Sequence, residues 1–117
     1  MITSEKVCEF VQERGGGVSL VELIRHFGNE GEGENAFMLK DRNVVFWGGM
    51  SDELIQAIIE ARKDRKIIDR PSTPLVYLVD GGISSLPLAK RPPKTGYKKL
   101  HWLPIVYWTP KQLEKIN

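Results

Sequence analysis

Apolar residues recur at helical spacing in two stretches near the start of the chain. A first helix is expected over residues 4–14, ended by the glycines at 15–17, and a second helix from Ser19 to Gly28. Ser19 followed three residues later by Glu22 is a capping-box pattern, which marks the start of the second helix. The residues on the two apolar faces are Val7, Phe10 and Val11 in the first helix and Leu20, Leu23, Ile24 and Phe27 in the second.

The third helical pattern is the longest. Ser51 is a favourable N-cap, and Asp52 and Glu53 complement the positive end of the helix dipole. Basic residues follow in the last turn, and we expect the helix to reach Arg65 or Lys66. Its apolar side is formed by Leu54, Ile55, Ile58, Ile59 and Ala61.

The segment between the second and third helices, residues 28–50, carries weaker signals. Residues 28–34 combine glycine with acidic residues, which predicts an exposed loop. Residues 34–42 are interpreted as a short helical turn. The β-branched and aromatic residues at 43–49, closed by two glycines, favour a short strand.

Two β-prone runs follow, at residues 75–79 and 103–108. Both are bounded by proline or glycine, and we expect them to pair as antiparallel strands. The connection between them, residues 80–102, is unusually long for a hairpin, and loops of this size in compact domains are usually functional or disordered. Thr109 and Pro110 then have the character of an N-cap and first residue of a short terminal helix.

Two short helices, a third helix and a β-hairpin resemble the winged-helix arrangement, a variant of helix-turn-helix. The segments that carry the resemblance are VSLVELIRHFG for the second helix, SDELIQAIIEARKDRKI for the third, and IIDRPSTPLVYLVDG leading into the first wing strand. The resemblance covers nearly the whole chain and implies one α+β domain over residues 1–117. In that domain three helices pack against a small antiparallel β-hairpin with a long basic wing at 80–102, and a short C-terminal helix follows.

Two features depart from the pattern of a winged-helix protein that reads DNA. The second and third helices are separated by the 28–50 insertion where such a protein has a tight turn. The polar side of the third helix also carries acidic residues, and carboxylates repel phosphates. These polar residues are Asp52, Glu53, Gln56 and Glu60. Only the C-terminal end of the helix is therefore suited to phosphate contacts, through Arg62, Lys63, Arg65 and Lys66.

Charge is distributed unevenly along the chain. Residues 81–117 contain seven basic residues and one acid, or +6, whereas residues 1–80 contain ten basic and 14 acidic residues, or −4. The net charge of +2 thus conceals a polarised molecule, and such asymmetry indicates an anionic partner, with nucleic acid as the first candidate.

The long connection holds most of this basic charge. Its cations supply partners for phosphates, and its aromatic residues supply rings that stack on bases or sugars. The cations are Lys90, Arg91, Lys94, Lys98 and Lys99, and the rings are Tyr97, His101 and Trp102. The alternatives are a solvated loop whose lysines aid solubility and, for Trp102, a place in the core.

Composition sets the broad class of protein. A chain of 117 residues with 41% apolar and 27% charged residues is large enough to bury one core without disulfides. The single Cys8 and the absence of zinc-ligand spacing favour a reducing compartment and predict no metal and no cofactor. The start of the chain lacks a signal-peptide pattern, and no apolar run is long enough to span a bilayer, so a cytoplasmic location is expected.

These observations predict a small nucleic-acid-binding protein, with DNA favoured over RNA and a role in transcription regulation as the corresponding context. No nucleophile with a base, pair of pocket carboxylates or metal set is found in the sequence, so the protein is not expected to be an enzyme. The alternative is a protein-interaction module that turns its acidic third-helix face to a basic protein or to a second copy in a homodimer. Membrane attachment is not expected, because no basic amphipathic helix accompanies the lysines.

Overall fold

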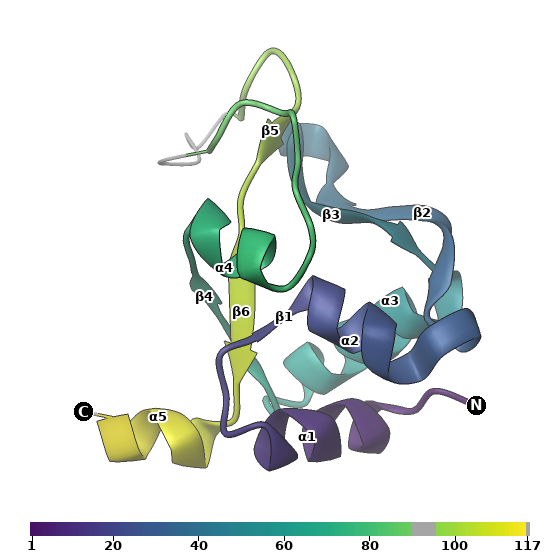
Figure 1. Cartoon of the computed structure of the whole chain (residues 1–117), viewed down its shortest axis with the longest axis vertical. Helices are drawn as coiled ribbons and strands as arrows, with labels where there is room; N and C mark the ends of the chain where they lie inside the picture. Colours follow the sequence, from purple (N-terminus) through teal and green to yellow (C-terminus); the bar gives the residue numbers. More distant parts are fainter. Residues whose placement is uncertain (90–95, 117) are drawn as a thin grey trace.

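The computed structural model describes residues 1–89 and 96–116 (Figure 1). These residues form an α+β fold, as predicted, with helices packed around two small sheets. The helices are α1 (Ser4–Glu13), α2 (Leu20–Phe27), α3 (Asp52–Lys63), α4 (Pro74–Val79) and α5 (Pro110–Ile116), with short 3₁₀ turns η1 (Gly28–Glu30) and η2 (Lys40–Arg42). The first sheet contains β1 (Val18–Ser19), β6 (Ile105–Trp108) and β4 (Ile68–Pro71) in that order, and the second contains β2 (Glu32–Leu39), β3 (Val44–Met50) and β5 (His101–Trp102).

The predicted positions of the first three helices and of the C-terminal helix are confirmed. The Ser19 hydroxyl accepts a hydrogen bond from the Glu22 N–H (3.1 Å) at the start of α2, and the Ser51 hydroxyl accepts one from the Leu54 N–H (3.1 Å) at the start of α3. These contacts satisfy N–H groups that lack a partner within the helix. The third helix ends at Lys63, slightly earlier than expected.

The predicted helical turn at residues 34–42 is wrong over most of its length. Residues 32–39 form β2, which pairs antiparallel with β3 through several register shifts, and only η2 at the end of the hairpin is helical. Phe37 explains why this segment forms a strand and not a helix, because its buried ring lies 5.0 Å from the ring of Phe46 on β3. The predicted strand at 43–49 is confirmed as β3. The predicted loop at 28–34 is partly regular, since it contains η1 and the start of β2.

The expected strand at residues 75–79 is also wrong, because these residues belong to α4. Its place beside β6 is taken by β4, which pairs antiparallel with β6 from Ile68 opposite Trp108 to Pro71 opposite Ile105. Pro74 occupies the first position of α4, where its fixed φ suits a helix. A five-residue apolar run does not by itself distinguish a strand from a buried helical turn.

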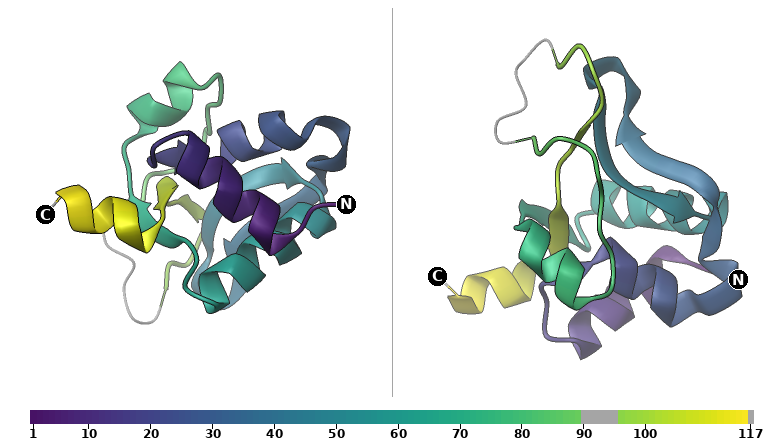
Figure 2. Two further views of the ribbon diagram at one scale, coloured as in Figure 1. Left: turned by 90° about the horizontal axis from the view of Figure 1, so that it is seen from below. Right: turned by 45° about the horizontal axis from the view of Figure 1, so that its top comes forward.

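The long connection is only partly a loop. Ala89 N–H donates to the Trp102 carbonyl and Trp102 N–H donates to the Pro87 carbonyl, both at 2.8 Å. Trp102 and His101 form β5, which runs parallel to β3 with Val45 opposite Trp102. The segment around Ala89 and the segment from Tyr97 to Trp102 are therefore held against the second sheet, and β5 lies at the opposite end of the molecule from α1 and α5 (Figures 1 and 2).

One hydrophobic core joins α1, α2, α3 and both sheets. Tyr77 of α4 enters this core, where its hydroxyl donates to the Ile105 carbonyl (2.7 Å) and accepts from the Leu20 N–H (3.2 Å). Its ring lies 5.0 Å from Trp47 and 5.3 Å from Trp102. This single side chain thereby ties α4 to the first sheet, to α2 and to the second sheet.

Tyr77 and Tyr107 are both fully buried, yet their hydroxyl groups differ. Among the described residues the Tyr107 hydroxyl has no hydrogen-bond partner, whereas that of Tyr77 has two. We expect Tyr77→Phe to lower the free energy of unfolding by about 2 kcal/mol, because it leaves a buried N–H and a buried carbonyl unpaired. Tyr107→Phe should leave stability unchanged or raise it by up to about 1 kcal/mol. Urea unfolding of the two variants measures the difference, and an equal loss for both would contradict this assignment.

Burial also makes the fold sensitive to alkali. It raises the pKa of Tyr77 to about 12 and raises that of Tyr107 as well. Because the folded state favours the protonated phenol of Tyr77, the contribution of this group to stability is complete below the ordinary pKa of 10 and is lost as pH rises through 12. Urea midpoints should therefore fall between about pH 10 and 12, and the fall should be smaller for Tyr77→Phe than for the parent protein. An identical pH dependence of the two proteins would exclude Tyr77 as a cause.

Candidate nucleic-acid interface

Two segments distant in the sequence meet at the end of the β2–β3 hairpin (Figure 1). Tyr97 N–H donates to the Arg42 carbonyl (3.0 Å), and the Asn43 side-chain amide donates to the Tyr97 carbonyl (2.7 Å). His101 N–H in turn donates to the Asn43 carbonyl (2.9 Å). The hairpin end and the approach to β5 therefore bring four cationic residues into one region, which we term the basic tip: Lys40, Arg42, Lys98 and Lys99.

Local backbone geometry permits this close approach. Gly96 has φ +85°, and a Cβ at this position would lie 2.5 Å from Arg42 Cα. Asn43, which ends η2, lies in the left-handed region with φ 54°, a conformation that asparagine tolerates better than most residues. Glycine at 96 and asparagine at 43 thus allow the two chain segments to pack backbone to backbone.

The four side chains of the basic tip are all exposed. None of the ion pairs among the described residues involves them, and Asp41 is the only acid in residues 40–43 and 96–101. Four cations against one carboxylate give the tip a local charge of +3. Exposed cations that form no ion pair in this part of the chain are suited to neutralise phosphates and to release counterions from nucleic acid.

Tyr97 and His101 form a stacked pair beside these cations. Their ring centroids are 3.8 Å apart with an interplanar angle of 15°, and both side chains are half-buried. His101 Nδ1 lies 2.9 Å from the Lys99 carbonyl, which fits a tautomer with the proton on Nδ1. The structure therefore brings together four of the predicted site residues: Tyr97, Lys98, Lys99 and His101.

The ring of Trp102 is buried, whereas one of the two sequence-based interpretations placed it on the surface as a stacking ring. It is 3% exposed, and its indole N–H donates to the Phe46 carbonyl (3.0 Å). Its ring packs edge-on to Tyr77 and lies 5.6 Å from Trp47. The core alternative is thus the correct one for Trp102, because successive residues of β5 point to opposite sides and only His101 faces the tip region.

Lys40 and Arg42 were not among the residues predicted from the sequence to bind nucleic acid. No local pattern marks them, since they lie in an insertion with weak secondary-structure signals and approach Lys98 and Lys99 only through long-range pairing. The remaining predicted cations of the wing, Lys90, Arg91 and Lys94, lie outside the described residues.

The four cations predicted to bind phosphates at the end of the third helix differ in their contacts: two of them form ion pairs within the fold and two do not. Arg62 Nε lies 2.9 Å from an Asp69 carboxylate oxygen, and its guanidinium lies 5.9 Å from the centre of the Phe37 ring. Lys66 Nζ lies 3.0 Å from Glu5 Oε1, a contact that raises the pKa of Lys66 and lowers that of Glu5. Exposed Lys63 and Arg65 form none of the ion pairs found in the described part of the chain.

The remaining surface of α3 is acidic, as predicted. Its exposed polar residues are Asp52, Glu53, Gln56 and Glu60. A phosphate backbone laid along this face would meet three carboxylates before it reached Lys63.

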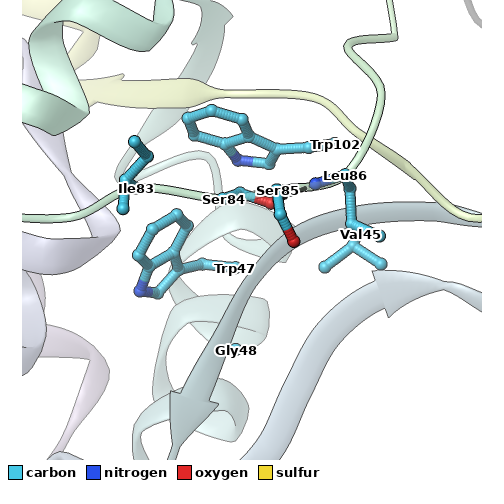
Figure 3. Close-up of a pocket in the computed structure, with 8 residues that line it drawn as sticks. All are labelled: Val45, Trp47, Gly48, Ile83, Ser84, Ser85, Leu86 and Trp102. Carbon is cyan, nitrogen blue, oxygen red and sulfur yellow. Dashed lines mark hydrogen bonds between the residues drawn. The ribbon is translucent and has the colours of Figure 1, made fainter.

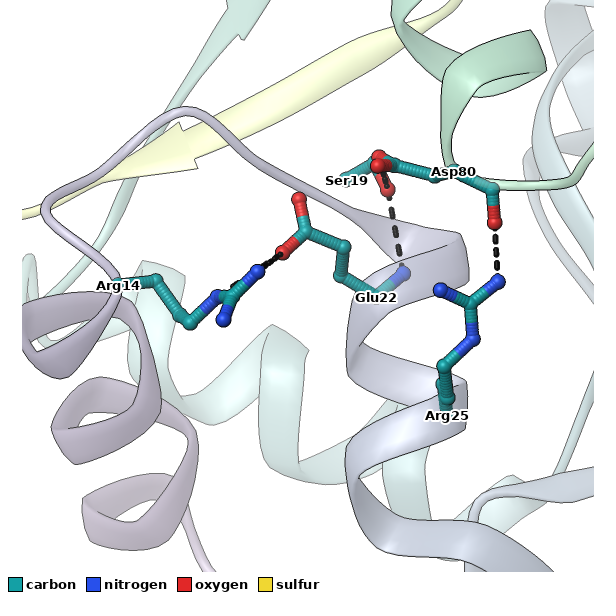
Figure 4. A network of polar contacts seen from close by, with 5 residues as sticks. All are labelled: Arg14, Ser19, Glu22, Arg25 and Asp80. Atoms are coloured by element: carbon teal, nitrogen blue, oxygen red, sulfur yellow. Dashed lines mark hydrogen bonds and ion pairs between the residues drawn. The ribbon is translucent and has the colours of Figure 1, made fainter.

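Two other arginines are held by a polar network between α1, α2 and the end of α4 (Figure 4). Arg14 forms an ion pair with Glu22 (3.2 Å), and Arg25 donates to the Asp80 carbonyl. The Ser19 hydroxyl donates to the Asp80 carboxylate (2.7 Å). These contacts fix α4 to α2, so the basic side chains on this face serve the fold.

Within residues 1–89 and 96–116, no cluster of histidine, cysteine and carboxylate side chains gathers to hold a metal ion. None of the helices in these residues has the length and apolar content needed to cross a bilayer. Comparison of the chain with protein-family models, curated proteins and solved structures finds no match.

Proposed function

We propose that the chain is a small nucleic-acid-binding protein that docks through the basic tip. The observation that carries the proposal is the convergence of four exposed cations from two distant segments, none of which takes part in an ion pair within residues 1–89 and 96–116. Phosphate contacts of this kind position a protein on nucleic acid without reading sequence. Binding should therefore depend steeply on salt and discriminate weakly between sequences.

The order of elements supports a winged-helix type of fold for this binder. The helices α1, α2 and α3 precede β4 and β6 along the chain, and β1 lies between α1 and α2. The strands β1, β6 and β4 form one antiparallel sheet in that order. On this assignment β4 and β6 are the wing strands, and the β2–β3 hairpin is the insertion between the second and third helices. DNA is the favoured partner because of this resemblance.

The basic tip replaces α3 as the docking element in this proposal. The acidic surface of α3 disfavours insertion into a groove, whereas the insertion and the long connection together build a cationic end. Lys63 and Arg65 are suited to additional backbone contacts, while Arg62 and Lys66 would first have to leave their carboxylate partners.

Fluorescence anisotropy tests the proposal. Labelled random duplex DNA, single-stranded DNA and RNA should each be titrated with the full chain at about 50 and 200 mM salt, the range over which phosphate contacts weaken strongly. We expect binding to at least one form, with affinity that falls steeply as salt rises. An absence of binding to all three forms at the lower salt concentration would overturn the proposal.

A protein-interaction module is the second candidate, favoured by the exposed apolar surface of α4 and of nearby Ile83. Leu75, Leu78, Val79 and Ile83 are 57–79% exposed, which is unusual for neighbouring aliphatic side chains. A second copy of the chain covering these residues would bury them. Sedimentation velocity distinguishes the modes, because apolar association persists at high salt whereas pairing of an acidic α3 face with a basic tip weakens. A monomer at all salt and protein concentrations would exclude self-association.

A further inference from the structure

A pocket of about 380 Å³ opens between β3 and the first part of the long connection (Figure 3). Its wall includes Val45 and Trp47 from β3 and Trp102 from β5. Ser84 and Ser85 add two hydroxyl groups from the connection. A volume of this size with mostly apolar walls and a few polar groups is typical of sites for small ligands.

The aromatic wall is fixed before any ligand binds. The rings of Trp47 and Trp102 lie 5.6 Å apart at 51°, and both contact the buried ring of Tyr77. Trp102 is also held by its hydrogen bond to the Phe46 carbonyl. Trp47 is half-buried and lines the pocket, so part of its side chain is accessible to a ligand.

The pocket and the basic tip are adjoining parts of one structure. His101 at the tip and Trp102 in the pocket wall are consecutive residues of β5, and Trp102 pairs with Val45 on β3. Asn43, which holds Tyr97 and His101, lies two residues before Val45. The pocket and the tip are therefore only a few residues apart along β3 and β5, a span that a strand of several nucleotides covers, although His101 and Trp102 point to opposite sides of β5.

We propose that this pocket receives an unpaired base of a single-stranded nucleic acid whose phosphates contact the basic tip. The inference rests on the proposed function and adds the class of nucleic acid. An open indole face stacks on any base. Ser84 Oγ accepts from the Leu86 N–H (3.2 Å), which leaves its own proton free to donate to the edge of a base.

A DNA duplex cannot place a base in this pocket unless its base pairing is disrupted. Its bases are paired and stacked inside the helix, so entry of one base requires it to leave the stack at an energetic cost. A single strand avoids that cost. The basic tip alone would bind both forms through phosphates, whereas the pocket adds affinity only for the single strand.

Binding of single-stranded and duplex DNA by pocket variants tests the inference. Oligonucleotides of about 15 nucleotides match the site sizes of known single-strand binders. The parent protein should bind the single strand about tenfold more tightly than the duplex, and Trp47→Leu should remove most of that difference without changing duplex affinity. A single-stranded RNA of the same length shows whether the pocket also accepts ribonucleotides.

Gly48→Val provides a second pocket variant in case Trp47→Leu does not fold. Gly48 lines the pocket, and a Cβ at this position meets no atom within 4 Å, so a side chain added there starts in open space. It should lower single-strand affinity about as much as Trp47→Leu. Trp108→Phe, which alters a tryptophan that does not line this pocket, is the matched control and should leave binding unchanged.

The Lys98→Gln/Lys99→Gln double variant separates the two proposals. If it weakens binding to both forms while Trp47→Leu and Gly48→Val leave single-strand affinity within about twofold, the pocket inference is overturned and the basic-tip proposal stands. If the parent protein binds both forms equally, the pocket holds no base. If the double variant binds every form as the parent does, the basic tip is not the docking site and both proposals fail.

Discussion

Neutralising the basic tip should lower the affinity for DNA about 100-fold or more at low salt. Each cation that contacts a phosphate contributes about 0.9 to the slope of log K against log salt on duplex DNA. The variant with glutamine at positions 40, 42, 98 and 99 should therefore show a slope smaller by roughly 3 to 4. The fold should survive, because these side chains are exposed and the hydrogen bonds at the hairpin end use the backbone of Arg42.

A second quadruple variant controls for net charge. Lys6, Arg70, Lys111 and Lys115 are exposed and, like the basic tip, comprise three lysines and one arginine. Changing them to glutamine also takes the net charge from +2 to −2. Affinity and salt slope should fall much less than in the tip variant. Equal losses in both variants would mean that general charge, and no particular surface, attracts the nucleic acid.

The parts of the fold that sequence predicted well depend on local signals. The caps at Ser19 and Ser51 act within one turn of their own helices, so their patterns specified where α2 and α3 begin. The C-terminal helix followed in the same way from Thr109 and Pro110, since Gln112 N–H donates to the Thr109 hydroxyl (3.3 Å). Such contacts involve only residues close together in the sequence, so they can be predicted without knowledge of the tertiary structure.

Long-range pairing accounts for the elements that sequence did not predict. The segment around Phe37 has residues compatible with a helix, but pairing with β3 and burial of its ring make it a strand. Residues 75–79 have strand-like composition, but two hydrogen bonds of the Tyr77 hydroxyl to distant backbone groups hold them as α4. In both cases tertiary contacts override a weak local preference.

The candidate site was predictable only in part for the same reason. A basic run in the sequence identified Lys98 and Lys99, because charge is visible without a structure. Lys40 and Arg42 join them only through the contacts of Asn43 and Arg42 with the chain before β5. The burial of Trp102 depends on the parallel pairing of β5 with β3. A strand of only two residues has no pattern that predicts such pairing from the sequence.

Trp102→Ala should lower the free energy of unfolding by about 3–5 kcal/mol, the usual cost of removing a large buried ring. The substitution removes the ring contacts with Trp47 and Tyr77 and leaves the Phe46 carbonyl without its indole donor. Trp102→Phe retains much of the ring volume and should cost less, about 1–2 kcal/mol, chiefly from the lost hydrogen bond.

Urea unfolding of the two Trp102 variants, combined with DNA binding by Trp102→Phe, distinguishes a core residue from an exposed stacking residue. A core residue gives a large stability loss for alanine, a smaller one for phenylalanine, and tip-dependent duplex affinity that is preserved in the folded phenylalanine variant. A stability loss below about 1 kcal/mol for Trp102→Ala would instead place the ring outside the core, because truncation of an exposed side chain rarely costs more. Trp102 was predicted to bind nucleic acid only because basic residues surround it in the sequence. Because its ring is buried, a stability measurement decides between that role and a place in the core.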